Sequence, residues 1–132
     1  MRKMHRRYVV LSLPVLLAAP LVALAHGPEK GPRGGVMADA GDYHLELIVG
    51  DGVLSLGVTD GEGKPVDTEG ATGSAFVLAN KKNTKLELAP GGGNLLKGKG
   101  DFKKAKGMKV VVLVTLPGRK PVRARFTPGA AE

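Results

Sequence analysis

The chain has 132 residues, a formal net charge of +8 at neutral pH and no cysteine. The lack of cysteine excludes disulfides, a thiol-linked lipid anchor and thiolate metal sites, so burial alone must hold the fold together. The 107 residues that follow position 25 are enough for one domain with a single core and too few for two.

The first 25 residues predict a cleavable signal peptide. They have a basic start, an apolar run over residues 8–24 and a small-x-small pattern at residues 23–25, which a signal peptidase recognises. A retained membrane anchor is the alternative, but Pro14 and Pro20 interrupt the apolar run. We therefore expect a periplasmic protein that begins at His26 and has no membrane span after cleavage.

Residues 26–35 contain two prolines and four glycines, which predicts a flexible arm ahead of a folded domain over residues 36–132. From Tyr43 onward the apolar residues recur at every second position, so His44 and Glu46 point away from the face that carries Leu45 and Leu47. Because Asp51-Gly52 is a tight-turn dipeptide, residues 43–59 are predicted to form a β-hairpin.

Further short strands are expected at 74–79, around 86–88, at 108–116 and at 122–126, separated by glycine- and proline-rich turns. About seven short strands with turns every eight to twelve residues predict an all-β fold, an immunoglobulin-like antiparallel β-sandwich. A small barrel is the main alternative.

The predicted amino-terminal histidine suggests a metal site. His26 would offer its α-amine and its imidazole, two nitrogen ligands that suit Cu(II) best among the common divalent ions. His44 is the other histidine after the signal, and Glu46 lies on the same face of its strand, so metal ligands are predicted at His26, His44 and Glu46. The alternative is that His44 and Glu46 are only the exposed face of an amphipathic strand. The predicted terminal histidine resembles the histidine brace of the copper-resistance protein C family.

Several short motifs resemble a family of small exported bacterial proteins that are often found beside heavy-metal efflux components. The motifs are Gly34-Gly35-Val36, residues 43–47, Val58-Thr59-Asp60, residues 63–66, residues 92–95 and Arg125-Phe126. This resemblance implies a role in metal homeostasis with efflux components as partners. Such relatives often carry histidine before the Gly-Gly pair, where this chain has Arg33, and that difference removes one potential ligand.

The charge distribution and the remaining motifs exclude other functions. Residues 26–79 hold nine acids and three bases, whereas residues 80–132 hold three acids and thirteen bases. The basic half has too few aromatic residues for nucleic-acid binding. Acidic residues between positions 60 and 69 do not follow the spacing of an EF-hand loop, and no catalytic set is present, so no enzyme is predicted. The expected function is the binding of a metal, copper or a related transition metal; a metal-free module that binds a membrane-protein partner is the alternative.

Overall fold

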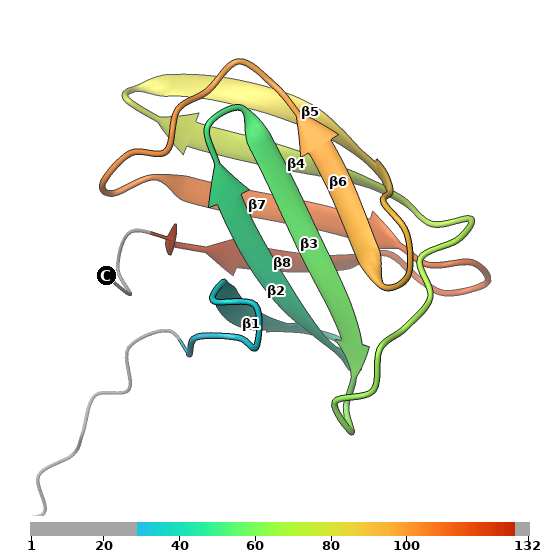
Figure 1. The fold of residues 1–132 in the computed structure, drawn as a ribbon. Helices are drawn as coiled ribbons and strands as arrows, with labels where there is room; N and C mark the ends of the chain where they lie inside the picture. Colours follow the sequence, from blue (N-terminus) through green and yellow to red (C-terminus); the bar gives the residue numbers. More distant parts are fainter. Residues whose placement is uncertain (1–28, 129–132) are drawn as a thin grey trace, which may run out of the picture.

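A computed structural model describes residues 29–128 and shows an all-β domain (Figure 1). The predicted signal peptide, residues 1–25, and His26 lie outside the described residues. The eight strands are β1 (Val36–Ala40), β2 (Tyr43–Gly50), β3 (Val53–Asp60), β4 (Thr72–Ala79), β5 (Lys82–Pro90), β6 (Leu95–Lys99), β7 (Lys109–Thr115) and β8 (Val122–Phe126).

The strands are all antiparallel and pair in the order β1-β2-β3-β6-β5-β4-β7-β8. The neighbours β2-β3-β6 and β4-β7-β8 follow the order of the two sheets of an immunoglobulin-type sandwich, whereas β5 pairs mainly with β4 of the opposite sheet. The all-β antiparallel prediction is therefore confirmed, with eight strands in place of about seven.

Strand β5 joins the two halves of this sandwich into one sheet. Its residues 82–88 pair with β4, whereas Ala89 and Pro90 pair with Lys97 and Leu96 of β6. At the other end of the strand order, β1 lies next to β8 (Figure 1). The sheet is therefore nearly closed. In this respect the fold also resembles a small barrel, which was the alternative to the predicted sandwich.

The alternation seen in the sequence sets which side chains form the core. Leu45 and Leu47 of β2 point inward and are at most 1 % exposed, as are the valines at every second position of β7. Because successive side chains of a strand point to opposite faces, His44 and Glu46 of β2 point outward. The core therefore fixes the face on which the predicted ligands lie.

Strand β1 was not expected from the sequence. It forms a hairpin with β2 in which Ala40 pairs with Tyr43, so only Gly41 and Asp42 form the turn. Gly41 has a φ of 58°, which a glycine adopts without steric cost. The inward positions of β1 after Val36 are alanines and its outward Met37 is apolar, so its apolar alternation is weak.

Residues 29–35 differ from the flexible arm that the sequence predicts. The N–H of Gly31 donates to the carbonyl of Gly35 at 2.8 Å, and the N–H of Met37 donates to the carbonyl of Glu29 at 2.9 Å. Lys30 forms a bridge with Val36. We call this hydrogen-bonded segment, residues 29–35, the N-terminal turn. Its glycines allow a close approach to β2.

Residues 29–128 contain no helix with the length and apolar content needed to cross a bilayer.

Candidate functional site

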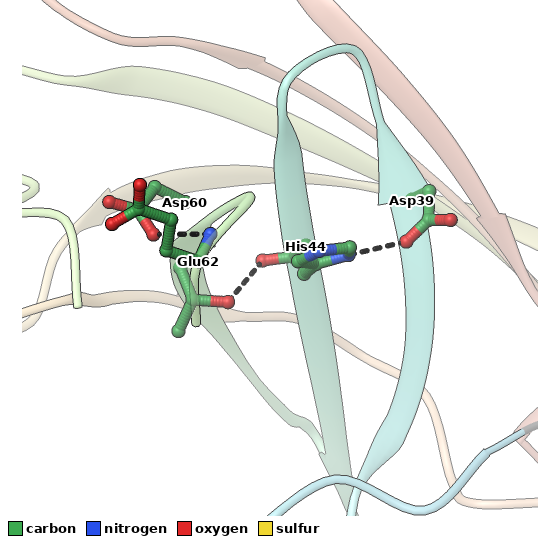
Figure 2. Close-up of polar contacts among 5 residues, drawn as sticks. Asp39, His44, Asp60 and Glu62 are labelled. Carbon is green, nitrogen blue, oxygen red and sulfur yellow. Dashed lines mark hydrogen bonds and ion pairs between the residues drawn. The ribbon is translucent and has the colours of Figure 1, made fainter. Parts of the chain in front are cut away.

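His44 lies on the outer face of β2, directly opposite Asp39 of β1 (Figure 2). The Nδ1 atom of His44 lies 2.5 Å from Oδ1 of Asp39. The histidine side chain is 39 % exposed and the aspartate side chain 82 % exposed. The β1–β2 hairpin thus brings together an imidazole and a carboxylate at the surface.

This contact determines which nitrogen of His44 can bind another group. A carboxylate accepts hydrogen bonds, so a neutral His44 next to Asp39 carries its proton on Nδ1 and donates it to Oδ1. The lone pair then lies on Nε2. Histidines that bind metals almost always donate their second ring N–H to a carboxylate, a carbonyl or water, which fixes the tautomer and the orientation of the ring. The pair therefore has the chemistry of a metal-binding histidine with its supporting carboxylate.

The surroundings of His44 on one side are acidic. A pocket of about 590 Å³ is lined by His44, by one guanidinium group, that of Arg119, and by the carboxylates of Asp39, Asp42, Asp60 and Glu62. Figure 2 shows the Asp60 to Glu62 turn on the side of His44 that faces away from Asp39. Because four carboxylates outnumber one guanidinium, the pocket is net negative, and a negative potential concentrates cations close to the imidazole.

Asp60 also has a structural role in this pocket. Its Oδ1 accepts the N–H groups of Lys64 and Glu62, both at 2.9 Å, and so closes the loop that follows β3. The hydrogen bond from Lys64 is the main cause that holds the pKa of Asp60 below its ordinary value of 3.8. The hydrogen bond from Glu62 and the charges of Lys64 and His44 act in the same direction, whereas desolvation acts against them. Asp60 therefore stays ionised to a lower pH than an ordinary aspartate does.

A second pocket, of about 420 Å³, lies along β2 and β3 under the N-terminal turn. Its lining residues are Pro32, Arg33, Met37, His44, Glu46, Gly57, Thr59, Gly63, Pro65 and Asn94. Arg33 closes one side, because its Nη2 donates to Oδ1 of Asn94 at 3.0 Å. His44 lines both pockets and Glu46 only this one. The two predicted ligands of β2 thus share one pocket.

Glu46 is only 5 % exposed, although it points away from the core. Its Oε2 accepts the backbone N–H groups of Arg33 and Gly35, at 2.8 and 2.9 Å. The carboxylate is therefore committed to the N-terminal turn. The interpretation of Glu46 as part of an exposed polar face is wrong, because the turn covers it.

The described residues alone do not supply a complete metal site. Among residues 29–128, no three histidine, cysteine, aspartate or glutamate side chains are arranged to hold a metal ion. The donor set near His44 nevertheless fits a transition metal in part, because it offers one imidazole nitrogen with a fixed tautomer and nearby carboxylates. His44 is the one histidine of residues 29–128, so a second imidazole would have to come from outside this range, where His26 lies.

The N-terminal turn begins close enough for such a contribution. Glu29 lies beside Met37, two residues from Asp39 on the same strand. With strands about 4.8 Å apart and about 3.4 Å per residue along a strand, the Cα atoms of Glu29 and His44 are roughly 12 Å apart. Three residues span up to about 10 Å, and each histidine side chain adds to that reach. The length of chain between His26 and Glu29 is thus compatible with a site shared by the two histidines.

Sequence reasoning missed Asp39, the residue that orients His44. A signal for it existed in the two-residue Gly41-Asp42 turn, since Gly-Asp between two extended segments is typical of a tight hairpin. That turn fixes the register, and the register places Asp39 opposite His44. The cover over Glu46 had no comparable signal, because residues 29–35 have no periodicity.

Comparisons with protein-family models, with curated proteins and with solved structures give no significant match to this chain.

Proposed function

We propose that this protein is an exported, periplasmic protein that binds copper or a related transition metal for a homeostasis or efflux system. His26 and His44 would be its nitrogen ligands. The observation that carries the proposal is the contact between Nδ1 of His44 and the Asp39 carboxylate, which leaves Nε2 as the ligand atom. The acidic pocket beside His44 supports it, because its carboxylates attract cations.

Each proposed ligand would have a distinct chemical role. After cleavage at residue 25, His26 would close a chelate ring with its α-amine and its imidazole, and an α-amine with a pKa near 8 loses its proton at modest cost. Nε2 of His44 would add a third nitrogen. Glu46 would act mainly through the N-terminal turn, because its carboxylate holds this turn against β2. It would thereby help to orient the ligands that precede Glu29.

Calorimetry with Cu(II) tests the proposal on protein whose first residue has been identified by mass spectrometry. Protein that begins at His26 is expected to bind one Cu(II) with micromolar or tighter affinity. His26→Ala and His44→Ala should each weaken binding strongly, and electron paramagnetic resonance should show hyperfine coupling to several nitrogens. Equal affinity in His26→Ala, or an amino terminus at another residue, would refute the proposed site.

Asp39→Asn provides a finer test, because it retains the shape of the side chain but removes the negative charge that supports the imidazole. Loss of such a partner costs about tenfold to a hundredfold in metal affinity. Asp42→Asn is the matched control, since Asp42 lines the same pocket but makes no hydrogen bond or ion pair with His44. An equal loss in both variants would show that only the overall charge of the pocket matters.

A further inference from the structure

The outer face of β5-β4-β7-β8 carries apolar side chains that the core does not use. Phe76 and Leu78 of β4 are 44 % and 40 % exposed, and Leu113 of β7 is 37 % exposed. Val111 of β7 is half-buried and lies opposite Phe76. These four residues, which we call the apolar stripe, occupy the two middle strands of this half of the sheet (Figure 1).

Cations border the apolar stripe on both sides. Lys85 of β5 lies opposite Phe76, with its Nζ 5.8 Å from the ring centre. Arg125 and Arg123 of β8 lie opposite Val111 and Leu113. Neither arginine makes a hydrogen bond or an ion pair with another described residue.

The remaining charged residues of this face leave it net positive. Lys109 of β7 lies opposite Leu78, and Glu87 of β5 is the one acid among these outward positions. Glu87 is 3.9 Å from Lys85, an exposed and weak ion pair. Four cations and one anion therefore surround the apolar stripe, which favours an anionic partner with an apolar part.

The size and position of the stripe argue against a protein partner. Two strand spacings and four residues along a strand give the apolar stripe an area of roughly 130 Å², far below the roughly 800 Å² that each partner contributes to a stable interface. Both β4 and β7 are already paired on their two sides, so a peptide cannot add to them as a further strand. The two pockets described above include no residue of this face, and neither does a third pocket of about 180 Å³ that β1, β2 and the N-terminal turn line.

We propose that the outer face of β5-β4-β7-β8 docks on the surface of a bilayer that contains anionic phospholipid. The apolar stripe would enter the boundary between headgroups and acyl chains, while the arginines and lysines would contact phosphate groups. Guanidinium groups suit this contact because their fork of donors matches phosphate geometry. The proposal does not depend on metal binding.

Vesicle sedimentation tests this proposal with protein purified from cells that express the full chain. Mass spectrometry identifies the first residue of each preparation, so that all variants compared have the same amino terminus. Vesicles with phosphatidylglycerol should bind the protein, and vesicles of phosphatidylcholine alone should bind it much less. Arg123→Gln with Arg125→Gln should lower the partition coefficient about tenfold to thirtyfold. Phe76→Thr should lower it as well.

The chain offers a matched control for each change. Lys97→Gln with Lys99→Gln removes the same charge from outward positions of β6, and Val53→Thr alters an exposed apolar residue of β3. Both controls should change binding less than twofold. Equal losses in test and control variants, or no difference between the two kinds of vesicle, would overturn the proposal. Binding to an immobilised acidic peptide but not to anionic vesicles would also overturn it and indicate a protein partner.

Discussion

At the level of single residues, Glu46 shows how an outward-facing carboxylate becomes part of the structure. Its Oε2 accepts two backbone N–H groups of the N-terminal turn, and such charge-assisted hydrogen bonds are about twice as strong as neutral ones. The Cβ of an alanine at Gly31 would lie 2.3 Å from the carboxyl carbon of Glu46. Glycine at this position is therefore a consequence of the buried carboxylate.

Glu46→Leu is expected to lower the free energy of unfolding by about 2–4 kcal/mol, because it leaves two N–H groups without an acceptor. Glu46→Gln, which keeps one acceptor oxygen, should cost about 1–2 kcal/mol. Urea unfolding followed by circular dichroism measures both. Glu87→Gln, at an exposed position of β5, should change the stability by less than about 0.5 kcal/mol. Unchanged stability in Glu46→Leu would show that the turn does not depend on this carboxylate.

Asp60 gives a prediction for acid conditions. Its pKa is lowered in the folded protein, chiefly by the hydrogen bond from Lys64, so the unfolded chain binds a proton at higher pH than the folded chain does. The stabilisation is therefore present above pH 4 and is lost as the pH falls through the folded pKa. Asp60→Asn should be less stable than the parent protein at pH 6, and the difference should shrink below pH 4.

Urea unfolding at several pH values measures this effect. Asp60→Ala is the control, because it removes the acceptor as well as the charge and should remain less stable than the parent protein even at pH 3. A difference between Asp60→Asn and the parent that stays constant from pH 6 to pH 3 would contradict the assignment.

At the level of elements, the sequence predicts those strands whose alternation is strong, and the structure confirms β2, β3, β7 and β8 close to the expected ranges. It predicts the outward direction of His44 for the same reason. The short β1 and the N-terminal turn escaped prediction because neither has a strong periodic pattern. Their positions depend on pairing with β2, which is a tertiary effect.

The N-terminal turn can be tested by a pair of glycine substitutions. A Cβ at Gly35 would lie 2.5 Å from the backbone oxygen of Leu47, so Gly35→Ala should push the turn off β2 and cost about 3 kcal/mol. Gly34 has open space around it but a φ of 78°, so Gly34→Ala should cost only about 1 kcal/mol. Thermal unfolding compares them. Similar losses in the two variants would mean that close packing against β2 is not the constraint.

At the level of the whole molecule, acidic and basic surface groups gather in different regions of one domain. The acidic pocket lies at the β1–β2 hairpin and the loop after β3, whereas the cationic face belongs to β5-β4-β7-β8. Both depend on the same core, to which buried residues of every strand contribute. The proposed metal site and the proposed bilayer surface can therefore be changed separately by surface substitutions, but not by substitutions in the core.

The shared core predicts that the two halves of the sandwich unfold together. Leu56 of β3 and Val112 of β7 are both 0 % exposed, and β5 joins their halves into one sheet. Leu56→Ala should lower stability by about 2–5 kcal/mol and Val112→Ala by about 2 kcal/mol, from lost burial and the cavity left behind. Leu113→Ala, at the exposed neighbour of Val112, is the control and should cost less than about 1 kcal/mol.

Amide hydrogen exchange measured by NMR shows whether each change spreads through the domain. In a cooperative domain, Val112→Ala reduces the protection of the slowest-exchanging amides of β3 as much as that of β7, because these amides exchange through global unfolding. Leu56→Ala should act equally on both halves in the same way. Strands β5 and β6 share only two paired residues each, fewer than any other neighbouring strands of the sheet. If the two halves of the sandwich unfolded separately, they would therefore part between β5 and β6. Protection of β3 that is unchanged in Val112→Ala would show that the halves unfold independently.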